Sequence, residues 1–423
     1  MKTKIFFLAG ALFVTLFVSA QKKQMTLQEC IDIALQNNRN IKQKEITKKS
    51  NEIAYSQSKL NLLPNLNGSA SQGWSFGRSQ LADGTYQNIN SSSTSYGLSG
   101  GITIFDGLRL KYNIDAKLAD LKASEADLQL IQRDMIMSVS TAFLNVLLDK
   151  ELLQVATDQL TLTKSKIEQQ KSLVKAGKLA EGEIYELLAQ EAKEEQSKIK
   201  ADNALSQAYL ELSQILEMDS YENFDIVIPE NLVESELKLL NPNLVYDSAV
   251  VNRPDIKSAE YRLKSSERNV DIAKSYFYPT LDFGANIGGG FYNSVNVPLN
   301  TKVGFDLRIP IFNKFETKNQ VKAAKLNVES NRLNLENSKI ELRKTVQQAY
   351  YNAIAAKARW DAASKSEIAS REAFRFVNQK NEAGRATVYE LYQAKNNLTQ
   401  VLSEVAQAKY EYVFRIKILE WLK

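Results

Sequence analysis

Apolar and polar residues alternate in two glycine-rich parts of the chain, at residues 66–105 and 280–312. Period-two alternation gives a β-strand two unlike faces, and aromatic residues near the strand ends are typical of membrane barrels. An ordinary soluble sheet would show the same alternation, so both kinds of sheet stay open on these segments alone. We expect four strands, at about 66–78, 94–105, 280–293 and 300–312.

Two long runs without glycine or proline follow the strand pairs, at residues 108–176 and 316–383. Both residue types break helices, so the runs predict very long helices, each roughly 100 Å in length at 1.5 Å per residue. Apolar residues recur at spacings of three, four and seven, as in coiled coils. A second helical pattern follows each run, at residues 183–218 and 388–422. The sequence therefore predicts one helical hairpin in each half of the chain.

The two halves of the chain repeat each other. Ile104-Phe105-Asp106 recurs as Ile311-Phe312-Asn313, and Gly177-Lys178 recurs as Gly384-Arg385, both 207 positions later. Nearer the start the offset is 215, which leaves eight extra residues for a loop between the first two strands. Constant offsets indicate an internal duplication. We expect a first repeat at 21–235 with its tip turn near 177, and a second at 236–423 with its tip turn near 384, intertwined as one domain.

The first 20 residues have the pattern of a secretory signal peptide. Lys2 and Lys4 precede an apolar stretch, and Val18-Ser19-Ala20 fits a small-residue cleavage site. A transmembrane anchor is the alternative, but the apolar stretch is shorter than the about 20 residues that a membrane helix needs. No second long apolar stretch follows. We therefore expect an exported protein.

The composition argues against catalysis. The chain has no histidine, which removes the commonest general base and metal ligand, and it has neither a phosphate-binding glycine loop nor a nucleophile triad. We expect no enzyme activity, no catalytic residue, no cofactor and no metal site. The formal net charge of +5 gives no support to nucleic-acid binding. Cys30 is the single cysteine, and we expect it in the core of a short helix.

Four strands are too few to close a barrel, since even eight leave an interior only just filled by side chains. Open strand edges in lipid would leave backbone groups without hydrogen bonds, so other copies of the chain must supply the missing strands. Two copies would give eight strands and little or no pore, whereas three would give twelve. The small polar residues expected on the inner face suit a wet interior. We expect a homotrimer.

Several motifs, in order and in duplicate, resemble the TolC family of outer-membrane efflux proteins over essentially the whole mature chain. The strand starts at Leu63-Pro64-Asn65-Leu66 and at Pro279 match, as do the strand ends at Phe105 and Phe312. Asn252-Arg253-Pro254-Asp255-Ile256 opens the second half as in the family. The most specific match is the tip turn, in which a glycine is followed six residues later by an acid, in segments 176–183 and 383–390.

The resemblance implies a mainly α-helical protein with a membrane β-barrel part. Three copies would form a 12-stranded barrel in the outer membrane, continuous with a barrel of 12 helices that extends into the periplasm. The implied partners are a periplasmic adaptor (membrane fusion protein), an inner-membrane pump and outer-membrane lipid. The implied function is the outer-membrane conduit of a tripartite efflux or type I secretion system.

The resemblance also implies roles for residues at the helical tips. Glu390 matches an acid that lines the narrowest point of the channel, but Gln393 stands where the family has a second acid, which leaves one carboxylate per chain instead of two. Glu183 is a further candidate for the constriction. The candidates for linking helices at the gate are Tyr185, Tyr392, Arg385 and Lys178. The tip residues implied to contact the adaptor are Ala176, Gly177, Lys178, Leu179, Ala383, Gly384, Arg385 and Ala386.

Plainer interpretations of these residues stand beside the functional ones. Gly177 and Gly384 suit left-handed helix caps, and an acid in the first turn of a helix is favoured by the helix dipole. The two tyrosines fit simple groove packing equally well. For the whole chain, the main rival is a secreted periplasmic trimeric coiled-coil protein with no channel. A periplasmic adaptor and an enzyme with a carboxylate pair are more distant rivals, and the exported substrate is not specified by the sequence.

Overall fold

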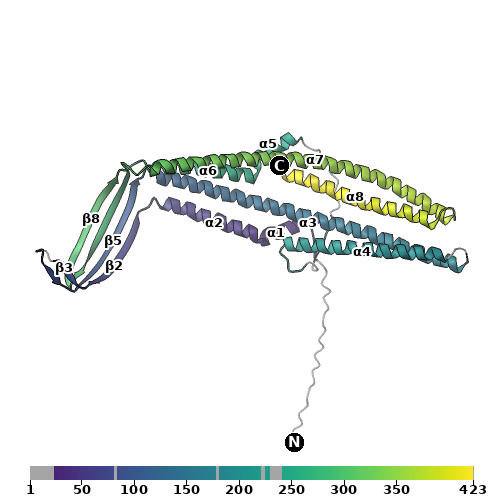
Figure 1. Ribbon diagram of the computed structural model, residues 1–423, viewed down its shortest axis with the longest axis horizontal. Coiled ribbons are helices and arrows are strands. Elements are labelled where there is room, and N and C mark those ends of the chain that lie inside the picture. The colour runs from purple at the N-terminus through teal and green to yellow at the C-terminus, as the bar shows by residue number, and fades with distance from the viewer. Residues whose placement is uncertain (1–22, 81–82, 178–180, 221–223, 229–240, 423) are drawn as a thin grey trace, which may run out of the picture. The chain divides into compact units, whose positions relative to one another are not determined.

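The computed structural model describes residues 23–80, 83–177, 181–220, 224–228 and 241–422 (Figure 1). The expected signal peptide lies outside these ranges, as do Lys178 and Leu179. The chain forms two compact units, and each draws on both halves of the sequence. We call one the strand unit (Arg39–Asp134, Leu239–Tyr351 and Leu419–Lys423) and the other the tip unit (Met1–Asn38, Met135–Lys238 and Asn352–Ile418).

The strand unit contains one antiparallel sheet of four long strands in the order β2-β5-β7-β8 (Figure 1). The strands are β2 (Asn65–Ser75), β5 (Ser91–Phe105), β7 (Thr280–Tyr292) and β8 (Val295–Arg308). Each half of the chain supplies one hairpin, and the pairing of β5 with β7 joins the two hairpins. The expected strand pairs and long helical hairpins are confirmed.

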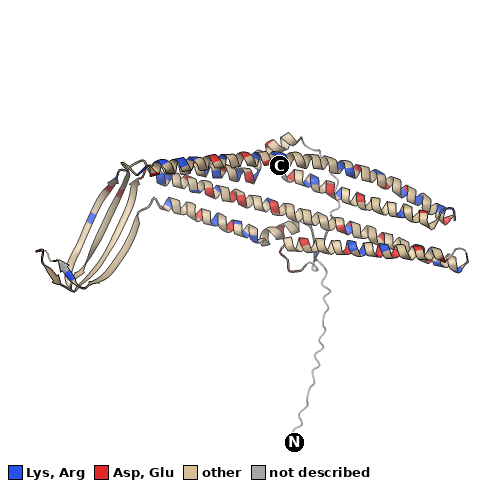
Figure 2. Ribbon diagram, viewed as in Figure 1, with Lys and Arg blue, Asp and Glu red and all other residues tan. Residues whose placement is uncertain are grey.

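The sheet has one apolar face and one polar face, and both are largely exposed. Phe283 of β7 lies opposite Phe305 of β8 and Ile102 of β5, so these side chains share a face. The aromatic rings of Phe283 and Phe305 are 5.2 Å apart between centroids. On the other face, Ser71 and Ser95 share a hydrogen bond of 2.7 Å. Figure 2 shows few charges on the strands and many along the helices.

The two hairpins of the sheet have unlike connections. Asn293 and Ser294 join β7 to β8 with φ values of 47° and 69°, as a two-residue hairpin turn requires. For this reason β8 begins at Val295, earlier than the residue 300 expected from the sequence. The connection from β2 to β5 is longer and contains a second small hairpin, β3 (Arg78–Gln80) and β4 (Tyr86–Asn88), where the extra residues of the first half were expected.

The strand unit also contains helices that precede the strands of the sheet and helices that follow them. They are α2 (Arg39–Leu60), α5 (Pro242–Asn252), α6 (Pro254–Ser275) and the first parts of α3 (Arg109–Lys175) and α7 (Glu316–Glu382). Asp106 accepts a 3.1 Å hydrogen bond from the Leu110 amide at the start of α3. Gly107 has φ of 69°, and a Cβ there would lie 2.8 Å from the Ser275 carbonyl oxygen, so no other residue fits. The repeated motif at Phe105 therefore encodes a helix start.

The tip unit contains α1 (Leu27–Asn37), α4 (Gly182–Ile215), α8 (Val388–Leu422) and the later parts of α3 and α7. A short parallel strand pair, β1 (Lys23–Met25) and β6 (Phe224–Ile226), was not expected from the sequence. Met25, Phe143, Leu212 and Phe224 are core residues, and Cys30 of α1 is buried among them as expected.

Asp225 of β6 anchors this strand pair to two helices. Its carboxylate accepts hydrogen bonds from Lys150 of α3 at 2.7 Å, from the Ile226 amide at 2.7 Å and from the Tyr209 hydroxyl of α4. Burial alone would raise the pKa of Asp225, but these donors outweigh it and hold the pKa at about 2. Within the described ranges, none of the helices combines the length and the hydropathy of a membrane span.

Candidate functional site

The turn between α7 and α8 is a glycine-capped helix end. Gly384 has φ of 70°, its amide donates to the Asn381 carbonyl at 2.9 Å, and the Arg385 amide donates to the Lys380 carbonyl at 2.8 Å. This bonding pattern ends a helix with a left-handed residue. Ala383, Gly384 and Arg385 are exposed, and Ala386 is half-buried with its carbonyl accepting from Asn381 at 3.0 Å.

Glu390, the expected constriction residue, forms a capping box with Thr387. Its Oε2 accepts from the Thr387 amide at 2.7 Å and from the Thr387 hydroxyl at 3.0 Å, and its own amide donates to Thr387 Oγ1 at 3.2 Å. The hydrogen bond from the Thr387 amide lowers the pKa of Glu390, and the bond from the hydroxyl adds to this. Glu390 and Gln393 are both exposed. The first-turn interpretation thus has a defined geometry, and the exposed carboxylate is compatible with a channel position.

The first tip turn, between α3 and α4, is described only in part. Gly177 has φ of 70°, and its amide donates to the Val174 carbonyl at 2.9 Å. Ala176 and Gly177 are exposed, whereas Lys178 and Leu179 lie outside the described residues. Glu183 lies in α4, but its side chain is also outside the described part of the chain. The sequence places Ala180 where Thr387 stands in the second half, so the first half lacks the threonine of the capping box.

The two repeated tyrosines have different surroundings. Tyr392 of α8 packs against Ile167 of α3, Leu187 of α4 and Val388 of α8, and burial raises its pKa to about 12. Tyr185 of α4 is 64% exposed. Groove packing therefore explains Tyr392, and this apolar group brings the two hairpins together near their tips.

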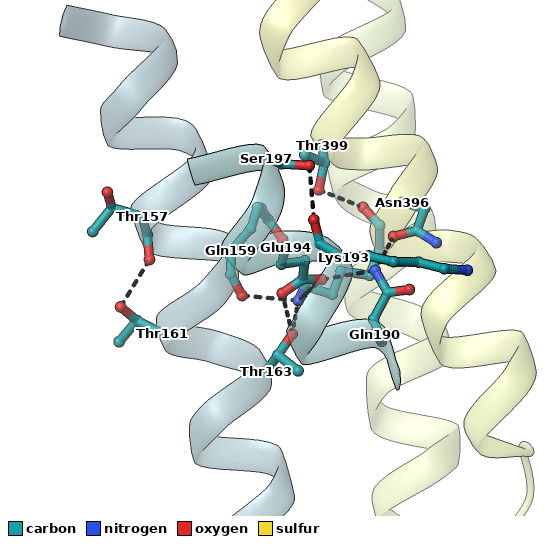
Figure 3. Close-up of polar contacts among 11 residues, drawn as sticks. Thr157, Gln159, Thr161, Thr163, Gln190, Lys193, Glu194, Ser197, Asn396 and Thr399 are labelled. Atoms are coloured by element: carbon teal, nitrogen blue, oxygen red, sulfur yellow. Dashed lines mark hydrogen bonds and ion pairs between the residues drawn. The ribbon is translucent and has the colours of Figure 1, made fainter. Parts of the chain in front are cut away.

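A buried polar cluster lies next to that apolar group, and the sequence did not predict it. Lys395 of α8 is 3% exposed, and its Nζ donates to Glu194 Oε1 of α4 at 2.8 Å. It also donates to the Gln159 carbonyl of α3 at 2.9 Å and to the Thr163 hydroxyl. Thr163 donates in turn to Glu194 Oε2 at 2.5 Å. Figure 3 shows Thr163 and Glu194 pointing toward each other between two helices.

The ammonium group of Lys395 is held entirely by oxygen acceptors. Its three hydrogen bonds use every donor that the group has. Burial still lowers the pKa of Lys395, although Glu194 counteracts part of the effect. Gln190 links the same helices, since its Nε2 donates to Glu194 Oε1 at 2.9 Å and to Asn396 Oδ1 at 3.1 Å. The cluster joins α3, α4 and α8 at one point.

Two further ion pairs cross between the hairpins within the tip unit. Lys166 of α3 lies 3.7 Å from Glu382 of α7, and Lys409 of α8 lies 3.3 Å from Glu151 of α3. Both pairs are partly exposed, so each contributes little by itself. We call the contact of α8 with α3 and α4 the intrachain seam. Among the described residues, no group of three or more His, Cys, Asp or Glu side chains could hold a metal ion.

The comparisons with known proteins agree with this architecture. The profile of the outer membrane efflux protein family matches residues 30–217 and 245–415. Toxin and drug export protein A of Aggregatibacter actinomycetemcomitans is 24% identical over 92% of this chain and 84% of its own length. Outer membrane protein TolC of Escherichia coli is 23% identical over 78% of this chain and 71% of its own length.

Solved structures share the fold. The crystal structure of CusC superposes with a TM-score of 0.81 at 18% identity and covers 94% of this chain and 91% of that chain. The Campylobacter jejuni CmeC outer membrane channel superposes with a TM-score of 0.80 at 20% identity, covering 94% and 85%. At these identities the likeness establishes the fold alone.

Fold and family profile define an outer-membrane channel. The chain belongs to the outer membrane efflux protein family, the TolC family. It is an outer-membrane efflux channel of tripartite efflux or secretion systems and extends into the periplasm. As a member of this family it is a transport protein and not an enzyme.

Proposed function

We propose that three copies of this chain form one conduit, with a 12-stranded barrel continuous with a tunnel of 12 helices. The observation that carries the proposal is the sheet of four strands with an exposed apolar face and with β2 and β8 at its edges. In lipid, the backbone groups of both edges need partners. Pairing β2 of one copy with β8 of the next satisfies them and closes a barrel.

The apolar face of the sheet supports its contact with lipid. Its exposed apolar side chains lie on three strands: Leu299, Val303, Phe305 and Leu307 of β8, Leu66 and Trp74 of β2, and Tyr96 and Leu98 of β5. The opposite face carries small or polar residues, which suit a wet channel. Two copies would supply eight strands, and side chains would fill the interior of so small a barrel. Three copies are therefore favoured.

We propose that the exposed tip turns bind a periplasmic adaptor that is attached to an inner-membrane pump. Ala176, Gly177, Ala383 and Gly384 present backbone and small side chains to solvent, and Arg385 presents a charged one. Lys178, Leu179 and Ala386 complete the proposed surface. Relatives are named for toxin, drug and solvent export. In this arrangement the pump selects the substrate, and the channel passes what it receives.

We propose that Glu390 faces the channel axis at its narrowest point, with Gln393 one turn further along and Glu183 contributing less. Three copies of one exposed carboxylate around an axis would attract cations. The free side chains of Arg385 and Tyr185 are the better placed of the gate-linking candidates, since Tyr392 packs within its own chain. Lys178 completes that set.

We also propose that the repeats at 21–235 and 236–423 arose by duplication and fold as one intertwined domain. Matching junctions support this, since Asp106 and Asn313 both bond within the first turn of the helix that follows. In the trimer the β3–β4 hairpin would lie at the cell exterior.

Mass measurement of the full mature chain in mild detergent tests the conduit. We expect particles of three chains that insert into planar bilayers and conduct ions. A stable membrane-inserted monomer, or a trimer recovered only with soluble periplasmic proteins, would contradict the proposal. The second result would favour the coiled-coil alternative.

A further inference from the structure

A cavity of about 390 Å³ lies in the strand unit, at the end of the sheet that adjoins the helices (Figure 1). One wall is the end of β5 with the start of α3, and the other is the end of α6 with the residues before β7. Gly107 holds the two walls together, because its close contacts with Ser275 and Tyr278 leave no room for a side chain. The cavity is therefore a fixed part of this junction.

The apolar part of the cavity continues the apolar face of the sheet. Phe105 of β5 pairs with Leu281 of β7, and Leu281 pairs with Leu307 of β8 on that face. Four apolar or aromatic side chains line the cavity: Phe105, Leu108, Tyr112 and Tyr278. Aromatic side chains of this kind are typical of the level at which lipid headgroups meet a barrel. An acyl chain that lies along the apolar face of the sheet can therefore continue into the cavity.

The polar part of the cavity carries one positive and one negative group. Lys274 and Asp271, both of α6, line it, and Lys274 Nζ lies 3.1 Å from Asp271 Oδ1. Arg268 lies 3.1 Å from the other oxygen of Asp271 and 3.9 Å from Asp115 of α3. The formal charges of these two cations and two carboxylates cancel. A group of this kind suits a zwitterion better than a ligand with a net charge.

We propose that the cavity binds a phospholipid with a zwitterionic phosphoethanolamine headgroup, from the periplasmic leaflet of the outer membrane. The lipid phosphate accepts a hydrogen bond from Lys274, the lipid ammonium group donates to Asp271, and an acyl chain lies against Phe105 and Leu108. The inference rests on the proposed barrel, whose apolar face contacts lipid. It adds a specific lipid partner to that barrel.

The charge pattern distinguishes this headgroup from two related ones. Phosphatidylglycerol has the phosphate but no cation, so it offers no donor of positive charge to Asp271. Phosphatidylcholine has a cation without N–H groups, so it cannot donate a hydrogen bond to the carboxylate. The loss of one hydrogen bond between charged groups at a partly exposed site should lower affinity about fivefold. We therefore expect phosphatidylethanolamine to bind more tightly than either of the other lipids.

Native mass spectrometry of the full mature trimer in mild detergent tests this preference. The three lipids are added separately with identical acyl chains. We expect up to three bound phosphatidylethanolamine molecules per trimer, at concentrations about fivefold lower than the other lipids need. Equal binding of all three would mean unspecific lipid around the barrel and would overturn the proposal. Complete displacement by free phosphoethanolamine would also overturn it, because the acyl chain would then contribute nothing.

Substitutions in α6 test the two polar contacts. Lys274→Met removes the donor to the phosphate and should weaken phosphatidylethanolamine binding about fivefold. Asp271→Asn removes the negative charge and should reduce the preference over phosphatidylglycerol. Lys264→Met is the matched control, because Lys264 is an exposed lysine of the same helix that does not line the cavity. Wild-type lipid binding in Lys274→Met would overturn the proposal.

Failure of the lipid site can be distinguished from failure of the barrel. A trimer that conducts ions in planar bilayers but has no preference among the three lipids would overturn the lipid site and leave the conduit standing. A chain that forms no membrane-inserted trimer would overturn both.

Discussion

Lys395 Nζ lies 2.8 Å from Glu194 Oε1, and both side chains are almost fully withdrawn from solvent. A buried ion pair of this kind is costly to break from one side, because the remaining charge keeps its burial and loses its partner. Replacing both members by apolar residues of similar size is often neutral. The Lys395–Glu194 pair therefore matters more for fixing how α8 packs against α4 than for the total free energy of unfolding.

Lys395→Met alone should lower the stability of the trimer by about 3 kcal/mol, because Glu194 stays buried without its counter-charge. Adding Glu194→Leu should restore most of this loss. Thermal unfolding in detergent at a fixed heating rate measures both effects. A single variant as stable as the double variant would mean that Glu194 finds water or another donor once Lys395 is gone.

Asp225 should give the tip unit a pH-dependent stability at acid pH. Its folded-state pKa of about 2 lies below the unfolded value, so its contribution is complete above about pH 4 and disappears as the pH falls through 2. Asp225→Asn should cost about 1–2 kcal/mol at pH 7 and much less at pH 2. Urea unfolding of both proteins at the two pH values measures the difference. If the two proteins differed in stability by the same amount at pH 7 and at pH 2, the ionised carboxylate of Asp225 would not be the stabilising form.

Cys30 should be inert in the folded protein. It is buried, and burial raises its pKa to about 11, so only about one thiol in a thousand is ionised at pH 8. A thiol reagent should react within minutes in denaturant and not detectably over the same time in the native trimer. Fast native labelling would place α1 away from the core of the tip unit.

Glu390→Gln separates the channel role from the capping role. Glutamine also completes a capping box, so trimer stability should be unchanged while preference for cations falls in single-channel recordings. Thr387→Ala is the matched control: it removes the cap at a cost of about 1 kcal/mol and keeps the carboxylate, so selectivity should persist. If the Glu390→Gln channel kept its preference for cations and its block by divalent ions, Glu390 would be a capping residue only.

The fold could be predicted from the sequence because its signals are local and duplicated. The glycine- and proline-free runs gave α3 and α7 almost to the residue, and alternation gave the four strands. The start of β8 was expected too late because Asn293-Ser294 forms a tight turn from residues other than glycine. The β1–β6 pair was missed because three-residue strands distant in sequence carry no periodic signal.

The tip site was predictable only in part. Gly384 caps the end of α7, and Glu390 lies in the first turn of α8. Both positions could be predicted from the local spacing of a glycine and an acid. The cluster around Lys395 depends on three helices from both halves, so no single segment reveals it. The one available signal was the repeat comparison, in which Lys395 and Glu194 both replace apolar counterparts at the same offset.

The pairing of β2 with β8 between copies is the central claim, and cysteine cross-linking tests it most directly. In a Cys30→Ser background, Ala70→Cys on β2 is combined in turn with cysteine on β8 at Leu299, Thr301, Val303, Phe305 or Leu307, which lie on the same face of the sheet. Ala70→Cys with Tyr96→Cys, which lie opposite each other within one chain, is the control. We expect one or two neighbouring β8 positions to give covalent dimers and trimers on denaturing gels, and the control to give monomers only. If no β8 position links chains while the control disulfide forms, the strands do not close a barrel between copies.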